Sequence, residues 1–436
     1  SDIPPLDIPD GNFLGALAPR KADAPPPIEM LLDEALDNPI GSEPLEKLAS
    51  PEAKVLLLVD DITRQTPASL LLPGIFRRLE RAGVARRNVK ILIAAGTHSH
   101  MTPAELERKL GPETARNVPV FLHHWKEEDR LVRIGEMADG TPVRVNRMLG
   151  EADLVAGIGQ IVPHRVMGFT GGASIVQPGV SGPEITGRTH WLSALYPGNA
   201  IMGVAENPVR QEVERIAKRA GLRFIVNVVM DSREQVVRVV AGDPVLAHRQ
   251  GAGISRSIYG VPQSGPADIV FAESYPADYD LWQAAKGVYA AELAVRRSGV
   301  VVLVTPCFHG VSTEHPEVET LGYRAVAEVE RMVETKKITD LVAAAHLAHV
   351  GRVIRDRALG IMVCHGIPPE VQQRIGFKPA HSPQEALELA FARVGRKAVA
   401  VAVLLQGGHV LPLPDSEQRS SEPVAAPASP GESMSG

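Results

Sequence analysis

One stretch of the sequence decides the fold: VLLLVDDITRQTP at residues 55–67. Five aliphatic residues, Val55 to Val59, are followed at once by two carboxylates, a hydroxyl and a guanidinium, and a helical pattern begins near Ser69. A short, wholly apolar run is typical of a strand that is buried on both faces of a parallel sheet. The stretch therefore predicts a unit of strand, polar loop and helix.

The same alternation continues along the chain. Strands are predicted at 89–94, 118–122 and 154–157, helices near 28–36, 69–82, 103–110 and 209–220, and a hairpin over 223–241. After a Gly- and Pro-rich break at 260–266, strands are predicted at 268–272, 299–304, 359–363 and 398–405, with helices near 281–297, 323–334, 339–350 and 382–394. This alternation indicates two α/β domains with mostly parallel sheets, and we expect the active site in the cleft between them.

The break sets the predicted domain boundaries. We predict an N-terminal α/β domain over residues 1–261 and a C-terminal α/β domain over 262–396. The pattern leaves open whether the final strand, about 397–414, returns to the first domain. Residues 415–436 are rich in Ser, Pro, Ala, Glu and Gly without periodicity, which predicts a disordered tail.

Composition narrows the class of protein. The 436 residues carry a net charge of −5 with 4% aromatic residues, which disfavours nucleic acid as a partner. No apolar run approaches the roughly 20 residues that span a bilayer, so we expect no membrane segment. The N-terminus lacks a signal-peptide pattern, and we expect a cytoplasmic protein. With 2 cysteines and 14 histidines, a metal held by the protein must rest on His, Asp or Glu.

Two polar clusters follow the first predicted strands. The first contains Asp61, Thr63 and Arg64, which suit either an anion site or a plain helix cap. The second contains His98 and His100, and we expect one of the two to face the cleft.

Two more clusters lie further along the chain. The third spans residues 157–182; its glycines suit phosphate binding or ordinary tight turns. It holds His164, Gly171, Gly172 and Ser174, and His190 follows. The fourth contains Trp282, Gln283 and Lys286; Gln283 and Lys286 share one face of a helix because they are three residues apart.

Taken together, the four clusters resemble the lactate racemase family, from about Asp10 to Leu413. The matching motifs are Asp-x-Thr-Arg-x-Thr-Pro at 61–67, Gly-Thr-His at 96–98, Pro-His-x-x-x-Gly-Phe-x-Gly-Gly at 163–172, and Gln-x-x-Lys-Gly at 283–287. The resemblance implies an enzyme that racemises or epimerises 2-hydroxy acids by reversible hydride transfer through a 2-keto acid intermediate.

The resemblance also implies a cofactor, the nickel-pincer nucleotide, a nickel(II) pyridinium-3,5-bisthiocarboxylic acid mononucleotide bound by the N-terminal domain. The enzymes that make this cofactor are then implied partners. His98 and His164 match the family's two acid/base histidines, and His190 matches its protein ligand to nickel. Residues expected to bind the cofactor are Asp61, Thr63, Arg64, Gly171, Gly172 and Ser174. Residues expected to bind the substrate are Arg64, Trp282, Gln283 and Lys286.

The chain departs from the family pattern at Ser174. There the family has a lysine that tethers the cofactor through a thioamide, and serine has no amine with which to form it. We therefore expect noncovalent cofactor binding. The alternative is a non-catalytic homologue that binds a nucleotide or an organic acid and has lost its tether.

Substrate choice is predicted from Arg77 and Arg78, on the helix that begins beside the first cluster. If either arginine faces the cleft, it can pair with a second carboxylate, which favours malate or a similar hydroxy diacid over lactate. The other interpretation is that both arginines lie on the solvated face of the helix.

Overall fold

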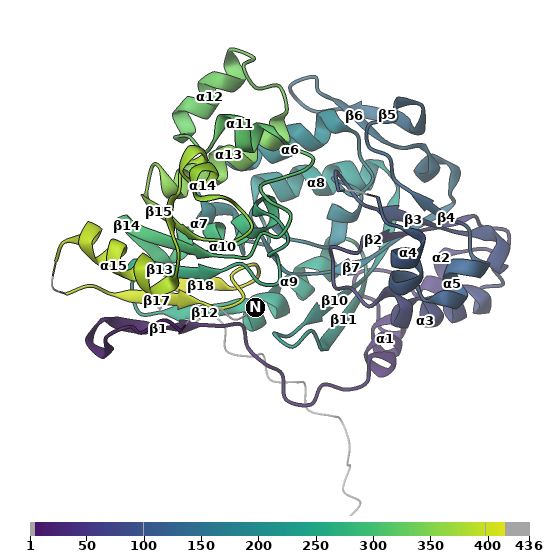
Figure 1. Ribbon diagram of the computed structural model, residues 1–436. Helices are drawn as coiled ribbons and strands as arrows, with labels where there is room; N and C mark the ends of the chain where they lie inside the picture. The colour runs from purple at the N-terminus through teal and green to yellow at the C-terminus, as the bar shows by residue number, and fades with distance from the viewer. Residues whose placement is uncertain (1–4, 99, 397, 415–436) are drawn as a thin grey trace, which may run out of the picture.

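The computed structural model describes residues 5–98, 100–396 and 398–414. Two six-stranded sheets, each covered by helices, form its two halves (Figure 1). The N-terminal sheet has the order β11-β10-β7-β2-β3-β4, and all its neighbours are parallel except the antiparallel hairpin of β10 and β11. Its strands are β2 (Val55–Asp60), β3 (Val89–Ala94), β4 (Val120–Leu122), β7 (Leu154–Gln160), β10 (Leu222–Met230) and β11 (Val236–Gly242). The predicted α/β class is confirmed.

The C-terminal sheet is parallel throughout, with the order β1-β17-β13-β14-β15-β16. Its strands are β1 (Phe13–Leu17), β13 (Ala267–Glu273), β14 (Val295–Val304), β15 (Ala358–Val363), β16 (Lys378–Ala380) and β17 (Val401–Leu404). Shorter pairs are β12 (Gly260–Gln263) with β18 (Leu411–Pro414), β5 (Leu131–Glu136) with β6 (Pro142–Asn146), and β8 (Pro163–His164) with β9 (Gly168–Phe169).

Two strands from opposite ends of the chain, β1 and β17, both lie in the C-terminal sheet. The final strand β17 pairs with β13, so the return to the first domain that was left open does not occur for residues 401–404. In turn, β1 pairs with β17, although residues 13–17 were assigned to the first domain. Leu17 and Leu404 pack into the same core as the helix at 281–294, and this packing, which local sequence does not encode, selects their sheet.

Helices cover both sheets. Those of the N-terminal half are α1 (Ile28–Asp37), α2 (Leu45–Leu48), α3 (Ala68–Arg81), α4 (Pro103–Leu110), α5 (Pro112–Asn117), α6 (Pro183–Ala194), α7 (Gly198–Ile201), α8 (Pro208–Arg219) and α9 (Leu246–Tyr259). Those of the C-terminal half are α10 (Leu281–Ala294), α11 (Glu317–Leu321), α12 (Val326–Glu334), α13 (Leu341–Ile354), α14 (Pro369–Ile375) and α15 (Pro383–Val394). Among the helices that the structure describes, none is long and apolar enough to cross a bilayer.

Helix α6 joins the two halves. It lies against α13 (Figure 1), where Gly187 lets the backbones approach, since a Cβ there would stand 3.0 Å from Cβ of Leu341. The hydroxyl of Ser193 on α6 bonds Nε2 of His349 on α13 at 3.1 Å. The sequence pattern did not predict α6, because glycine is unfavourable inside a helix and its close packing becomes visible only in three dimensions.

Candidate active site

A cavity lies between the two halves, beyond the carboxyl ends of β2, β3 and β7. Both halves contribute to its wall, as open α/β sheets do at their ligand sites. All four predicted clusters meet there. The predicted residues that line it are Asp61, Arg64, His98, His164, Gly171, Ser174, His190, Trp282, Gln283 and Lys286.

His98 is held by Asp61. Its Nδ1 lies 2.7 Å from Oδ2 of Asp61, and Oδ1 of Asp61 accepts bonds from the backbone N–H and the hydroxyl of Thr63 at 3.1 and 2.6 Å. Burial opposes ionisation of Asp61, but the charge and hydrogen bond of His98, together with Arg64, outweigh it and keep the pKa of this carboxyl well below its usual value. The ionised carboxylate can only accept, so Nδ1 of His98 is the donor in this contact and Nε2 is the ring nitrogen left for another partner.

Arg64 is placed by a buried lysine. Nζ of Lys109 donates to the backbone carbonyl of Arg64 at 2.8 Å and forms an ion pair with Asp60 at 2.8 Å. The Arg64 guanidinium itself donates to the hydroxyl of Thr63 at 3.0 Å. Thr63 thus lies beside His98 and Arg64 and helps to hold both side chains in position.

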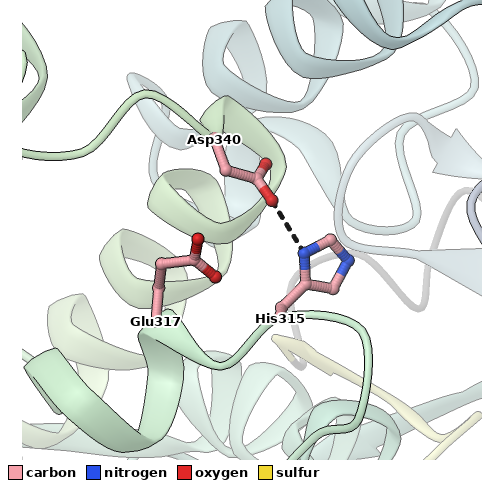
Figure 2. A group of neighbouring side chains, drawn as sticks. All are labelled: His315, Glu317 and Asp340. Carbon is pink, nitrogen blue, oxygen red and sulfur yellow. Dashed lines mark hydrogen bonds and ion pairs between the residues drawn. The ribbon is translucent and has the colours of Figure 1, made fainter. Parts of the chain in front are cut away.

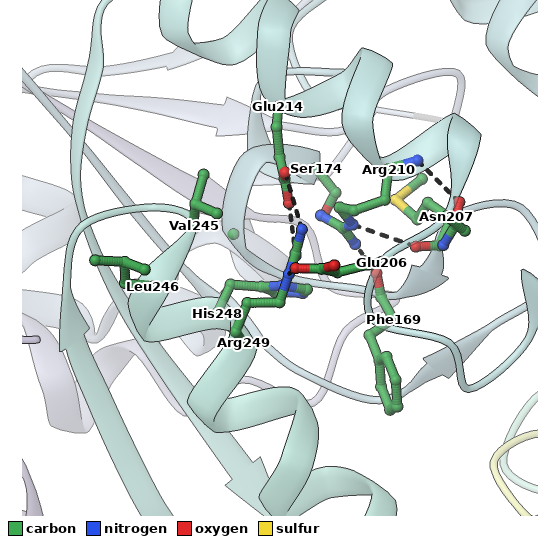
Figure 3. Close-up of polar contacts among 12 residues, drawn as sticks. Phe169, Ser174, Glu206, Asn207, Arg210, Glu214, Val245, Leu246, His248 and Arg249 are labelled. Carbon is green, nitrogen blue, oxygen red and sulfur yellow. Dashed lines mark hydrogen bonds and ion pairs between the residues drawn. The ribbon is translucent and has the colours of Figure 1, made fainter. Parts of the chain in front are cut away.

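His164 stands at the end of β8, in a loop clamped by Arg210. The fully buried Arg210 guanidinium donates to the carbonyls of Met167 at 3.2 Å and Gly171 at 3.1 Å, and also to that of Phe169 (Figure 3). Burial, followed by the positive charges of Arg64, Lys286 and neighbouring groups, holds the pKa of His164 well below its ordinary value. His164 is therefore neutral at pH 7 and able to accept a proton.

The glycine loop shows why one predicted cofactor contact is wrong. The N–H of Gly172 donates to Oδ1 of Asn227 at 2.7 Å, so this amide is not free to bind a phosphate. Gly172 itself does not line the cavity, whereas Gly171 does. A Cβ on Gly172, at φ 58°, would meet the His248 ring at 2.9 Å, so glycine is needed here for packing. Ser174 lines the cavity and donates to the Gly171 carbonyl at 2.9 Å.

His190 has the environment of a metal ligand. Its Nδ1–H donates to the carbonyl of Thr186 at 2.8 Å, one turn earlier on α6, which leaves the Nε2 lone pair available. Burial lowers the pKa of His190 to about 4, although the Thr186 bond opposes this shift. The imidazole is therefore neutral at pH 7, the form that binds metals.

The C-terminal half contributes the first turns of α10. Asp280 caps this helix, since its Oδ1 accepts from the backbone N–H of Gln283 at 2.8 Å. Burial and the charge of Arg64 lower the pKa of Lys286 to about 7, against the opposing charges of Asp280 and Asp61. Arg64 and Lys286 thus bring two cationic groups to one cavity, where they suit anionic substrate groups.

Arg77 and Arg78 do not reach the cavity, so the expectation that one of them faces the cleft is wrong. Arg78 is only 5% exposed and forms ion pairs with Asp33, Asp37 and Glu46, at 3.3, 2.5 and 3.1 Å, which tie α3 to α1 and α2. The Arg77 side chain is 51% exposed and lies 3.7 Å from Asp33. Both lie on the side of α3 that faces α1, and the rotation of α3 about its axis is set by core packing.

Several lining residues were given no role from the sequence. Asn227 interrupts the apolar strand β10, and His346 and His349 stand three residues apart in the apolar helix α13. A polar residue within a buried apolar element needs a partner or a function, and this was the available signal. The spacing of these residues alone did not show which cavity they enter.

The fold and the cavity define a two-domain α/β enzyme with a histidine-lined active site. A model of the lactate racemase N-terminal domain matches residues 2–202, and a model of the lactate racemase C-terminal domain matches residues 263–411. The chain therefore belongs to the lactate racemase family, and it is an isomerase.

Similar proteins agree with this assignment. Lactate racemase of Thermoanaerobacterium thermosaccharolyticum is 32% identical over 310 residues, 70% of this chain and 72% of that protein. Lactate racemase of Lactiplantibacillus plantarum is 28% identical over 93% of this chain and 96% of its own length. The solved lactate racemase apoprotein of T. thermosaccharolyticum superposes with a TM-score of 0.85 at 28% identity, covering 94% of this chain and 97% of that one. A Thermotoga maritima crystal structure, at 22% identity and a TM-score of 0.72, shares the fold.

Proposed function

We propose that the protein racemises 2-hydroxy acids with the nickel-pincer nucleotide, with His98 and His164 as the acid/base pair and His190 as the protein ligand to nickel. The observation that carries the proposal is that three histidines from separate segments line one cavity together with Arg64 and Lys286. When bound, the cofactor would supply a hydride acceptor, which avoids proton abstraction from the weakly acidic C2–H of a hydroxy acid.

The two acid/base histidines are held by different means. Asp61 holds the His98 ring through its Nδ1, whereas burial keeps His164 neutral. In the proposed reaction, one histidine accepts the hydroxyl proton of the substrate and the other donates a proton to the oxygen of the 2-keto acid. After each turnover the two have exchanged roles, as racemisation in both directions requires. Arg64 and Lys286 bind the carboxylate, and Gln283 orients it.

The residues of this chain fit the cofactor at the nickel but not at the tether. Neutral His190, with its Nδ1–H engaged, offers Nε2 to the metal. Ser174 has no amine, so we propose noncovalent binding. The contacts that remain for the cofactor are Asp61, Arg64, Gly171 and the hydroxyl of Ser174, all of which line the cavity.

A preference for malate or a similar hydroxy diacid has lost the support expected from Arg77 and Arg78. What still supports it is the presence of two cations, Arg64 and Lys286, in one cavity, because each can pair with one carboxylate. Single enantiomers of lactate and malate, followed by chiral chromatography, test this choice. Faster turnover of lactate than of malate would reject it.

The decisive experiment is expression with the cofactor-making enzymes, followed by measurement of nickel content and of racemisation. We expect nickel in the wild type and in a His381→Ala control, which changes an exposed histidine far along the chain, and loss of nickel and activity in His190→Ala. An intact mass equal to that of the bare chain after denaturation is expected for noncovalent binding. A wild type without nickel or activity despite cofactor supply would favour the alternative, a non-catalytic binding protein.

A further inference from the structure

The indole of Trp282 is stacked between two imidazoles. The ring centroids of Trp282 and His315 are 4.0 Å apart at an interplanar angle of 17°, and those of Trp282 and His346 are 4.1 Å apart at 15°. Trp282 also lines the active-site cavity. His346 lines this cavity as well, whereas His315, on the other face of the indole, is not among its lining residues.

Both outer rings of the stack are anchored. Nδ1 of His315 bonds Oδ2 of Asp340 at 2.9 Å (Figure 2). His346 is held from both sides, by the hydroxyls of Tyr289 at 2.9 Å and Tyr323 at 3.0 Å. A ring bonded through its nitrogens cannot rotate freely, so each outer imidazole presents a fixed face to the indole.

Asp340 has a second role, as the cap of α13. Its Oδ1 accepts from the backbone N–H groups of Val342 at 2.8 Å and Ala343 at 3.1 Å. Glu317 lies nearby, and one atom each of Glu317, Asp340 and His315 lie within 4.8 Å of one another, a spacing that a metal could bridge (Figure 2). Both Asp340 oxygens, however, already accept hydrogen bonds, so helix capping and anchoring of His315 account for the arrangement.

The backbone beside the stack is fixed by the loop that leads to His315. The N–H groups of Leu281 and Trp282 donate to the carbonyls of Gly310 and Val311, both at 3.0 Å. These two donors belong to the first turn of α10. The first two turns of this helix also carry Gln283 and Lys286, which line the cavity. The 310–315 segment thus holds this end of α10 through both its backbone and the His315 ring.

We propose that His315, anchored by Asp340, is a positioning residue that holds Trp282 and, through the start of α10, places Gln283 and Lys286 in the cavity. The inference rests on the proposed function, in which Gln283 and Lys286 contact the substrate carboxylate. His315 itself need not contact the substrate.

The experiment uses the full chain in a Trp125→Phe, Trp191→Phe background, so that fluorescence reports Trp282 alone. His315→Ala removes the stacked ring, and His315→Phe keeps a ring but removes the bond to Asp340. We expect His315→Ala to increase acrylamide quenching of Trp282 at least about twofold, because the indole loses one covered face. His315→Phe should stay near the parent, and His381→Ala serves as the control for loss of an unrelated histidine.

Kinetics of the cofactor-loaded enzyme supply the second measurement. We expect His315→Ala to lower kcat/KM for the 2-hydroxy acid about tenfold to a hundredfold, mainly through KM, because the carboxylate contacts shift while His98 and His164 remain in place. His315→Phe should recover most of this loss.

Three results would overturn the inference: unchanged quenching in His315→Ala, unchanged KM in that variant, or a folded His315→Phe as impaired as His315→Ala. If circular dichroism shows that His315→Ala does not fold, His315→Leu replaces it, since leucine fills the space of the imidazole but offers no flat ring to stack on the indole. Increased quenching with a raised KM is then still required. If no variant racemises anything, the parent included, the proposed function fails, whereas the quenching result still decides whether His315 positions Trp282.

Discussion

Lys286 is subject to opposing demands. The carboxylate contact proposed for it requires its charged form, yet burial and the neighbouring Arg64 lower its pKa from 10.5 to about 7. The same burial strengthens its attraction for an anion, because fewer water molecules screen the pair. At neutral pH, Lys286 is therefore close to the midpoint of its titration, between the charged ammonium that contacts a carboxylate strongly and the neutral amine.

A pH dependence follows from this shift. Because the pKa in the folded protein is lowered, the ammonium is present below about pH 7 and is lost as the pH rises above it. We expect KM for a 2-hydroxy acid to rise about tenfold per pH unit at most between pH 7 and 8.5. Lys286→Arg stays charged over this range, so its KM should be nearly constant. An equally steep rise in Lys286→Arg would show that another group causes it.

At the scale of elements, the β8–β9 hairpin decides where His164 stands. Gly168 in this hairpin has φ 84°, and a Cβ there would stand 2.0 Å from the carbonyl oxygen of Val204. Arg210 then fixes the same hairpin through three carbonyls. The glycines of the Pro163–Gly172 motif therefore include a position where glycine allows two backbones to touch, independently of any ligand.

Gly168→Ala tests this account against a matched control. Gly221, also at φ 84°, has nothing within 4 Å of its Cβ position, so Gly221→Ala carries the backbone strain without the clash. We expect Gly221→Ala to lower the free energy of unfolding by about 1–2 kcal/mol and Gly168→Ala by about 3 kcal/mol or more. Urea denaturation measures both. Equal losses would mean that the contact with Val204 is relieved by a small backbone shift.

At the scale of the whole molecule, the N-terminal segment crosses between the halves. β1 pairs with β17 at the edge of the C-terminal sheet, with Leu17 buried against its core, and the backbone of Arg20 then bonds Ile258 and Ser232 in the N-terminal half. The cavity lies between the same two halves, so this N-terminal segment, residues 13–20, restrains their relative position.

Removal of residues 1–17 should therefore weaken the C-terminal half. It exposes the edge of β17 and takes away the burial of Leu17, which is worth about 2–3 kcal/mol. We expect the thermal midpoint to fall by about 4–6 °C and aggregation on heating to increase. Differential scanning fluorimetry measures the midpoint, with removal of residues 1–9 as the control that keeps β1. Equal thermal midpoints for the two truncations would show that β1 does not stabilise the C-terminal half.

The sequence alone determined the α/β class, most strands and helices of the two sheets, and the residues at the four polar clusters. This worked because period and length of apolar runs are local properties, and because the carboxyl ends of neighbouring parallel strands meet at one edge, so that Asp61, His98 and His164 converge.

Only the tertiary structure decided which strands pair, which face of α3 carries Arg77 and Arg78, and what supports the site. β1 and β17 lie in the C-terminal sheet, and Arg78 forms ion pairs with the carboxylates of α1 and α2. The His315 ring stacks on Trp282. These outcomes depend on packing between segments that are separate along the chain, such as Arg78 and Asp37, which are 41 residues apart. The free energy of such packing depends on partners that a local pattern does not contain.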